Sequence, residues 1–294
     1  MNKRTITERD LRFLHTFCAA AEAGGFAAAE GRLHMTKATI SRQIKEVEEN
    51  LGVTLCSRGP QGFELTEAGK TALKYAKEAL DALDRIVPQL DAMRGVISGK
   101  LRIGITDNLL GNPSAKISQA LTRLKKEAPE VEFSLYTLTT HELVESLRTR
   151  RLDIIIKGIH PGQEIKSFNY TKLFGEKHFI CYSPQDNCEV SEMSLVFREK
   201  HPFVEDAIAN YGFKVGPVVS GMESVATLIS TGLFAGILPE QYSAMLSSVF
   251  PLEQIPDTPE YNVNHFAVTN ADYPLTPASE AFVKLLIEEH QGVE

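Results

Sequence analysis

The chain has 294 residues, of which 43% are hydrophobic and 23% charged, and its net charge at pH 7 is -7. This length predicts more than one folded domain, and the composition excludes a disordered or collagen-like chain. The apolar stretch at 225–238 is too short and too often interrupted by Ser, Thr and Gly to span a bilayer, and the N-terminus has no apolar signal core. The sequence therefore predicts a cytoplasmic protein without membrane contact.

The four cysteines show neither a C-x-x-C pair nor the spacing of zinc ligands. Reduced, buried or incidental thiols are the simpler interpretation for a cytosolic chain, and no metal or cofactor is expected. A redox pair formed by Cys181 and Cys188 is the alternative that remains open.

Residues 27–69 (AAAEGRLHMTKATISRQIKEVEENLGVTLCSRGPQGFELTEAG) predict a helix, a tight turn, a second helix, a short hairpin and the start of a third helix. Thr36 is a good N-cap for the second helix, and Gly52 is a good stop. A stripe at helical spacing is expected to be buried: Ile40, Ile44, Val47 and Leu51. Side chains near the N-terminal half fall largely off this stripe: Lys37, Ser41, Arg42 and Lys45.

A helix-turn-helix uses this layout to place the N-terminal part of its second helix against base edges in the major groove. Arg42 could bond guanine, while its neighbours could reach bases or phosphates. The alternative is an ordinary amphipathic helix with a solvated face, which Glu46, Glu48 and Glu49 favour because they would repel phosphate. The expected hairpin, with strands at 53–55 and 63–65 and Arg58 near its tip, favours DNA binding.

These residues resemble the N-terminal domain of LysR-type transcriptional regulators, through GGFAAAEGRLHMTKATISRQIKEVEENLGVTL, Arg58 and LTEAG at 65–69. The resemblance extends over essentially the whole chain. It implies that Arg58 is the wing arginine and that the DNA-reading positions are Thr36, Lys37, Ala38, Ser41 and Arg42. Two departures are Cys56, where the family usually has a large apolar residue, and Gln61, where many members have a second basic residue.

The acidic charge lies outside this module. Residues 1–100 hold 15 Lys+Arg and 13 Asp+Glu, whereas residues 101–294 hold 16 and 25. Because the excess of cations in the module is small, DNA affinity would depend on clustered cations and on two or more copies.

Residues 66–94 predict a helix capped by Thr66, followed by a hinge at 95–99. Its apolar residues alternate spacings of three and four, which is a heptad seam that favours a partner helix. The resemblance implies a dimerisation helix with contacts at Leu73, Leu80, Leu83, Val87 and Leu90. The alternative is a helix packed on its own domain, and Pro88 is expected to break or kink it so that the seam ends near Val87.

From residue 100, strand-like and helix-like runs alternate, which predicts a parallel sheet covered by helices. The landmarks LRIGI, ELVESLRTRRLDIIIKG and ESVATLISTGLFAGILP resemble the family's effector-binding domain, which has the fold of periplasmic binding proteins. The resemblance implies two lobes, about 100–162 with 267–294 and about 163–266. The expected architecture is an α/β chain with an α-rich winged helix-turn-helix at 1–65, a linker at 66–99 and an effector domain at 100–294.

Ligands of open α/β sheets bind beyond the carboxyl ends of the strands. This rule selects Thr106, Asp107, Asn108, Thr139, Thr140, Ile159, His160, Phe197, Arg198, Ser220, Met222 and Glu223. Hydroxyls and helix-start N–H groups could hold a carboxylate or another small polar ligand, with Arg198 as its partner. Asp107 and Glu223 favour an amine or hydroxyl instead, Arg198 could be a solvated surface residue, and the apolar members could be core.

An enzyme is a competing interpretation, with an acid–base site drawn from Asp107, His141, His160 and Glu223. The sequence contains no nucleophile elbow, phosphate loop or H-E-x-x-H motif to support it. A solute-binding protein is disfavoured by the N-terminal match. The predicted function is a non-enzymatic regulator that binds double-stranded DNA and a small-molecule effector. By resemblance it forms a dimer and a tetramer, with RNA polymerase as a further candidate partner.

Overall fold

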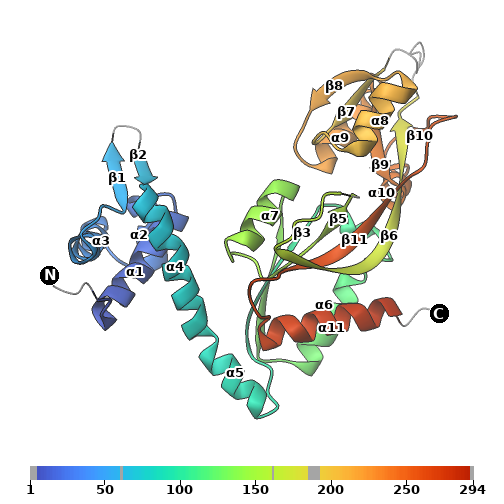
Figure 1. Cartoon of the computed structure of the whole chain (residues 1–294). Helices are drawn as coiled ribbons and strands as arrows, with labels where there is room; N and C mark the ends of the chain where they lie inside the picture. The colour runs from blue at the N-terminus through green and yellow to red at the C-terminus, as the bar shows by residue number, and fades with distance from the viewer. Residues whose placement is uncertain (1–4, 60–61, 161, 185–192, 292–294) are drawn as a thin grey trace. The chain divides into compact units, whose positions relative to one another are not determined.

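The computed structural model describes residues 5–59, 62–160, 162–184 and 193–291, with the backbone alone at 58, 59 and 62. Contacts along the chain divide it into two units, Met1–Val87 and Pro88–Glu294 (Figure 1). The expected hairpin residue Gln61 and the expected redox partner Cys188 lie outside the described residues.

The N-terminal unit consists of three short helices, a hairpin and a longer helix. These are α1 (Glu8–Glu22), α2 (Phe26–Leu33), α3 (Lys37–Leu51), β1 (Cys56–Gly59), β2 (Gly62–Leu65) and α4 (Glu67–Asp84). The first three helices pack around Phe17, Ile40 and Ile44, which are fully buried. This order of elements confirms the winged helix-turn-helix, but the prediction of the first strand at 53–55 was wrong, because that strand is Cys56–Gly59.

The base of the hairpin is fastened to the start of α4. The Thr66 hydroxyl donates to the Thr54 carbonyl at 2.6 Å and accepts from the Gly69 N–H at 2.9 Å, so one side chain caps the helix and holds the hairpin. A Cβ atom at Gly69 would lie 1.9 Å from the Leu55 carbonyl oxygen. Only glycine permits this close approach of helix and strand.

The expected single helix at 66–94 is two helices, α4 and α5 (Ile86–Met93). The break is at Arg85, which ends α4, and Pro88 lies in the first turn of α5. A proline costs little there, because the first N–H groups of a helix have no intrahelical partner. Pro88 is therefore compatible with α5, and the interruption precedes it.

The C-terminal unit is built on one mixed sheet with the strand order β4-β3-β5-β11-β6-β9-β7-β8 and with β10 beside β6. The strands are β3 (Gly99–Ile105), β4 (Val131–Thr137), β5 (Ile154–Ile159), β6 (Phe168–Tyr182), β7 (Ser194–Phe197), β8 (Lys214–Val218), β9 (Phe234–Pro239), β10 (Glu253–Gln254) and β11 (Tyr261–Asn270). β3 runs parallel to β4 and β5, and β7 runs parallel to β8 and β9. The two groups are joined by β6 and β11, which are antiparallel to each other.

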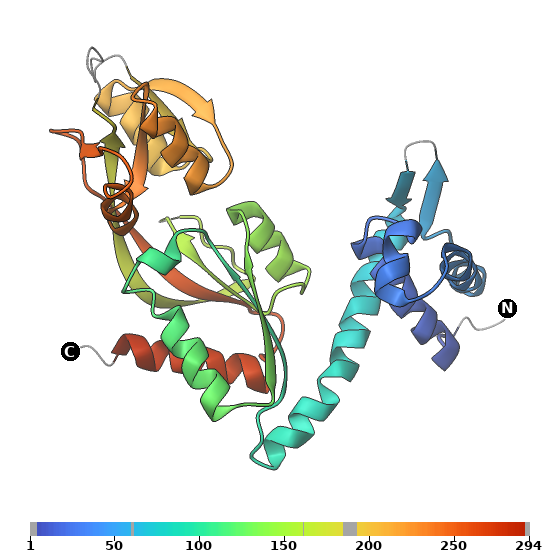
Figure 2. The same cartoon turned by 180° about the vertical axis from the view of Figure 1, so that it is seen from behind.

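Helices cover both faces of this sheet at each end (Figures 1 and 2). We call the first lobe β3, β4 and β5 with α6 (Ile117–Glu127) and α11 (Pro277–Gln291) on one face and α7 (Thr140–Arg148) on the other. The second lobe has β7, β8 and β9 with α8 (Pro202–Tyr211) on one face and α9 (Met222–Ser230) and α10 (Glu240–Leu246) on the other. Side chains along β5 alternate between the two faces of the sheet. Ile154 and Ile156 pack under α6, whereas Ile155 packs under α7.

The two lobes are connected by continuous strands. β6 pairs with β11 from Phe168 to His178 and then with β9 from His178 to Cys181. β11 also pairs with β5. The sequence resemblance implied that the second lobe begins at about residue 163, so we propose that the lobe boundary lies further along, near Gly175.

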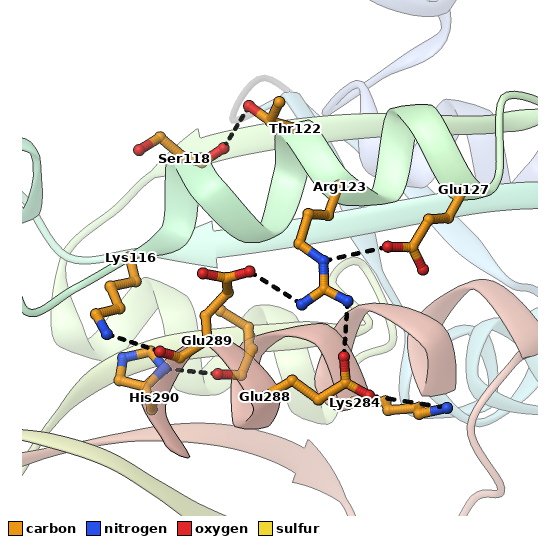
Figure 3. A network of polar contacts seen from close by, with 10 residues as sticks. Lys116, Ser118, Thr122, Arg123, Glu127, Lys284, Glu288, Glu289 and His290 are labelled. Carbon is orange, nitrogen blue, oxygen red and sulfur yellow. Dashed lines mark hydrogen bonds and ion pairs between the residues drawn. The ribbon is translucent and has the colours of Figure 1, made fainter. Parts of the chain in front are cut away.

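A polar network fastens α11 to α6 in the first lobe (Figure 3). The Arg123 guanidinium donates to Glu127 at 3.1 Å on its own helix and to Glu288 and Glu289 on α11 at 2.7 and 3.0 Å. Nearby, Lys116 Nζ donates to the Glu289 carbonyl at 2.7 Å. Three of these contacts thus join α6 or its N-cap residue to α11 beside the apolar interface between the helices.

Candidate functional site

The exposed face of α3 has the composition expected of a DNA-reading helix. The Thr36 hydroxyl caps it by accepting from the Thr39 N–H, and Ile40, Ile44 and Val47 are fully buried on the opposite face. Four of the other predicted positions are solvent-exposed: Lys37, Ala38, Arg42 and Lys45. Ser41 is half-buried. The Arg42 side chain has no hydrogen-bond or ion-pair partner among the described residues, which leaves its guanidinium free for a partner outside the chain.

The acidic half of α3 is occupied by contacts within the protein. Glu46 pairs with Arg9 of α1, and Glu49 lies 3.7 Å from Lys45 one turn away. Glu48 Oε1 accepts from the backbone N–H groups of Leu55 and Cys56, and so holds the start of the hairpin. These carboxylates therefore have structural roles, which weakens their argument against DNA binding.

Arg58 lies in β1 opposite Phe63 of β2, and its side chain is outside the description. Cys56 is buried in the core of this unit and pairs in register with Leu65. A small apolar thiol thus fills the position at which a large side chain was expected, so the departure is compatible with packing.

The predicted dimerisation seam divides into two parts. Leu73, Ala76 and Leu80 pack against the core of the N-terminal unit itself, as the alternative interpretation held. Leu83, Val87 and Leu90 are 46%, 64% and 51% exposed. The apolar seam that is free for a partner thus begins after Leu80.

In the C-terminal unit, a cavity lies at the carboxyl ends of β3, β5 and β7, between the two lobes. Its volume is about 90 Å³. Eight of the predicted effector residues line it: Thr106, Asp107, Asn108, Thr140, His160, Phe197, Arg198 and Met222. The rule for open α/β sheets therefore selected residues at the edge of the sheet where this cavity lies.

The other four predicted residues lie elsewhere. Thr139 and Ser220 line an adjoining hollow of about 290 Å³ that shares Asp107 and Arg198 with the cavity. Glu223 faces a separate, more open hollow beside α10. Ile159 is buried in the core under α7, so its packing role is structural.

Asp107 joins the two lobes across the cavity. Its Oδ2 atom accepts from the Met222 backbone N–H at 2.7 Å, at the first turn of α9, and its Oδ1 atom accepts from Arg198 Nη1. A carboxylate is stabilised there both by the guanidinium and by the partial positive charge of a helix N-terminus. The protein's own acid thus occupies the position at which an acidic ligand was expected.

The sequence pattern missed the most buried polar groups of the cavity, which are Lys157, Glu176, His178, His201 and His265. Glu176 Oε1 accepts from Asn112 at 2.6 Å, and its Oε2 atom lies 3.1 Å from His178 Nε2. Burial raises the pKa of Glu176, but the contacts with His178, His265 and Asn112 outweigh it and hold the pKa below its usual value. The surrounding sequence, NYTKLFGEKH, is rich in polar residues and therefore did not indicate that Glu176 is buried.

Three histidines of the cavity, His160, His201 and His265, are held in their neutral form. Burial lowers the pKa of His160 to about 4, that of His201 to about 3 and that of His265 to about 4. The rings of His160 and His201 stack with centroids 5.0 Å apart, and the His265 ring stacks on Phe174 at 4.6 Å. At neutral pH each ring offers one N–H donor and one acceptor.

Comparison with known proteins assigns both units. A model described as "LysR substrate binding domain" matches residues 94–291, and one described as "Bacterial regulatory helix-turn-helix protein, lysR family" matches residues 11–70. The chain belongs to the LysR family of transcriptional regulators.

LysR-family relatives match along most of the chain. The activator BauR of Pseudomonas aeruginosa is 27% identical over 252 residues, which cover 81% of this chain and 81% of BauR. The regulator ClcR of Pseudomonas putida is 30% identical over 254 residues, covering 81% and 85%. The structure of full-length CbnR complexed with its target DNA has a TM-score of 0.63 at 22% identity, covering 95% of this chain and 99% of that one. LysG from Corynebacterium glutamicum with bound Arg has a TM-score of 0.55 at 17% identity and covers 95% and 98%.

As a LysR-family member, the chain is a DNA-binding transcriptional regulator with a C-terminal domain for a small-molecule effector. Its relatives are named regulators, which decides against the enzyme interpretation. None of the helices in the described part of the chain has the length and hydropathy needed to cross a bilayer.

Proposed function

We propose that the N-terminal half of α3 reads an operator in the major groove and that an effector in the interlobe cavity controls this contact. The proposed location of the regulator is the cytoplasm. The observation that carries the proposal is the Asp107 link, because the cavity lies where one lobe contacts the other. A ligand that enters there changes contacts on both lobes. It can shift the regulator between two states only if it binds one of them more tightly.

The DNA-reading part is supported by the free guanidinium of Arg42 beside the exposed Lys37, Ala38 and Lys45. Arginine pairs bidentately with guanine, and lysine neutralises phosphate. Thr36 and Ser41 can add hydroxyl contacts to phosphates, and Arg58 can add one from the hairpin.

The oligomer is supported by two apolar surfaces. Leu83, Val87 and Leu90 continue the heptad pattern without cover, which favours pairing with the same helix of a second copy. In the C-terminal unit the edge strand β4 exposes Phe133, Leu135 and Tyr136. An exposed apolar edge strand favours association, so we propose a second contact between copies here and a tetramer built from the two interfaces. RNA polymerase is a further proposed partner of the assembled regulator.

The test is operator binding by the full-length protein, measured by fluorescence anisotropy on a duplex found by footprinting. We expect Arg42→Ala to weaken binding by about tenfold to a hundredfold and to lower the salt dependence, while circular dichroism is unchanged. Arg151→Ala, an exposed arginine of the C-terminal unit, is the matched control. Equal affinities for the two variants would refute the assignment of α3.

A further inference from the structure

Lys157 is a buried cation that the assignments above leave without a role. It lies near the end of β5, and only 6% of its surface is exposed. Its ammonium group has no hydrogen-bond or ion-pair partner among the residues that the structure describes. The acid that acts on it most is Glu199, which is itself exposed.

An isolated charge is expensive to bury, so a lysine in this position needs a compensating partner. Burial lowers the pKa of Lys157 below its usual value, with Glu199 opposing that shift. The other acids that line the cavity are already engaged, Asp107 by Arg198 and the Met222 N–H and Glu176 by Asn112 and His178. Lys157 is therefore a cation on the cavity wall that no carboxylate of the described residues contacts within hydrogen-bond or ion-pair distance, although Glu199 acts on it from further away.

The groups around Lys157 can solvate an anion but cannot neutralise the lysine. Nδ1 of His160, His201 and His265 is buried without a hydrogen-bond partner in the described structure. All three rings line the same cavity, and Lys157 acts electrostatically on His160 and His265. Neutral imidazoles donate N–H bonds to an oxyanion, as they do in many polar sites.

We propose that the cavity binds the oxyanion group of a small acid, a carboxylate or a phosphate, with Lys157 as its charge partner and buried imidazoles as further donors. This inference rests on the proposed function, because the acid would be the effector. The cavity volume of about 90 Å³ is several times the roughly 10–15 Å³ that one water molecule requires. It therefore accepts the charged group of a compact acid, whose remainder extends into the adjoining hollow at Thr139 and Ser220.

The experiment uses the full-length protein and a panel of sodium salts at constant ionic strength: acetate, malonate, succinate, phosphate and, as a reference, chloride. Ethylammonium chloride is the cationic probe. We expect one organic acid or phosphate to raise the melting temperature above the chloride reference and to give a saturable heat in calorimetry. The carboxylate and phosphate arms distinguish the two sources of the oxyanion.

Lys157→Met tests the residue, since it keeps the length of the side chain and removes the charge. We expect the melting temperature without ligand to be unchanged or higher, because a buried charge has been removed, while affinity for the acid falls about tenfold or more. Lys172→Met is the matched control. Both lysines lie opposite Phe266 in the sheet, but Lys172 is exposed.

Unchanged affinity in Lys157→Met, or stabilisation by ethylammonium and by none of the anions, would overturn the anion site. Operator binding is measured on the same samples. An anion that binds through Lys157 but leaves DNA affinity and bending unchanged would sustain the site and overturn the regulatory proposal. An amine that binds in the cavity and changes DNA affinity would overturn the anion site and sustain the regulatory proposal.

Discussion

Asp107 Oδ2 accepts a hydrogen bond from the Met222 backbone N–H at 2.7 Å, which joins a loop of the first lobe to the first turn of α9 in the second. The same carboxylate pairs with Arg198. Through these two contacts the Asp107 carboxylate, rather than a bound ligand, links the two lobes.

We expect Asp107→Asn to loosen this link. The amide oxygen can still accept from Met222, but the charge pairing with Arg198 is lost. Hydrogen exchange at the start of α9 should accelerate by roughly threefold to tenfold, because a partly exposed charged contact is worth about 1 kcal/mol. Asp272→Asn, on the exposed turn after β11, is the control, and equal exchange in both variants would contradict the role of Asp107.

Gly69 offers a stability test with an internal control of opposite sign. A Cβ at Gly69 would lie 1.9 Å from the Leu55 carbonyl oxygen, whereas one at Gly31 in α2 meets nothing within 4 Å. We expect Gly69→Ala to destabilise the N-terminal unit by about 2 kcal/mol or more through backbone displacement. Gly31→Ala should stabilise it by about 0.5–1 kcal/mol through helix propensity. Urea unfolding followed by circular dichroism measures both, and a stabilised Gly69→Ala would disprove the packing argument.

Acid should destabilise the C-terminal unit through its buried histidines. Burial lowers the pKa of His201 from 6.5 to about 3. As the pH falls below 6.5 the unfolded chain takes up a proton that the folded chain does not, so stability is complete above pH 6.5 and declines toward the folded pKa. Allowing for partial exposure, His201 contributes a loss of roughly 1–2 kcal/mol between pH 7 and pH 5.

His201→Phe should flatten this part of the profile, while His141→Phe, on the exposed face of α7, should leave it unchanged. The measurement is the free energy of unfolding in urea at pH 7, 6 and 5. Parallel profiles for His201→Phe and the parent protein would show that protonation of His201 is not involved.

Cys181 should be unreactive in the folded protein. Burial raises the pKa of its thiol to about 12, and only 3% of its surface is exposed. Because the thiolate is the reactive form, we expect negligible alkylation by iodoacetamide at pH 8 until the protein is unfolded. Mass spectrometry of the labelled peptide measures this, and rapid native labelling would reopen the redox interpretation with Cys188.

The sequence predicted elements well wherever one short window held the whole pattern. In α3 the cap, the buried stripe and the stop all lie within residues 36–52, and the predicted bounds agree with the structure. Strand β9, which ends the landmark ESVATLISTGLFAGILP, is likewise a short unbroken run of small and apolar residues, and all but its first residue are buried. Local patterns of this kind are set by secondary-structure period and capping.

Features that depend on distant partners were missed. The first part of β6, Phe168–Lys177, carries alternating polar residues, and its strand conformation comes from pairing with β11 much later in the chain. Leu73 and Leu80 fit a dimer seam by spacing, and each is half-buried against the core of its own unit, which the spacing did not indicate. Nothing near Lys157 in the sequence indicates that its side chain is buried in the lining of a cavity.

The register of β6 and β11 shifts between His265 and Phe266, so that Leu173 of β6 has no residue opposite it. This bulge bends the sheet where both strands pass between the lobes. His265 lines the cavity, and Phe266 is the cross-strand neighbour of Lys157. A ligand that contacts His265 and Lys157 would therefore lie directly beside this bulge, where the strands pass from one lobe to the other.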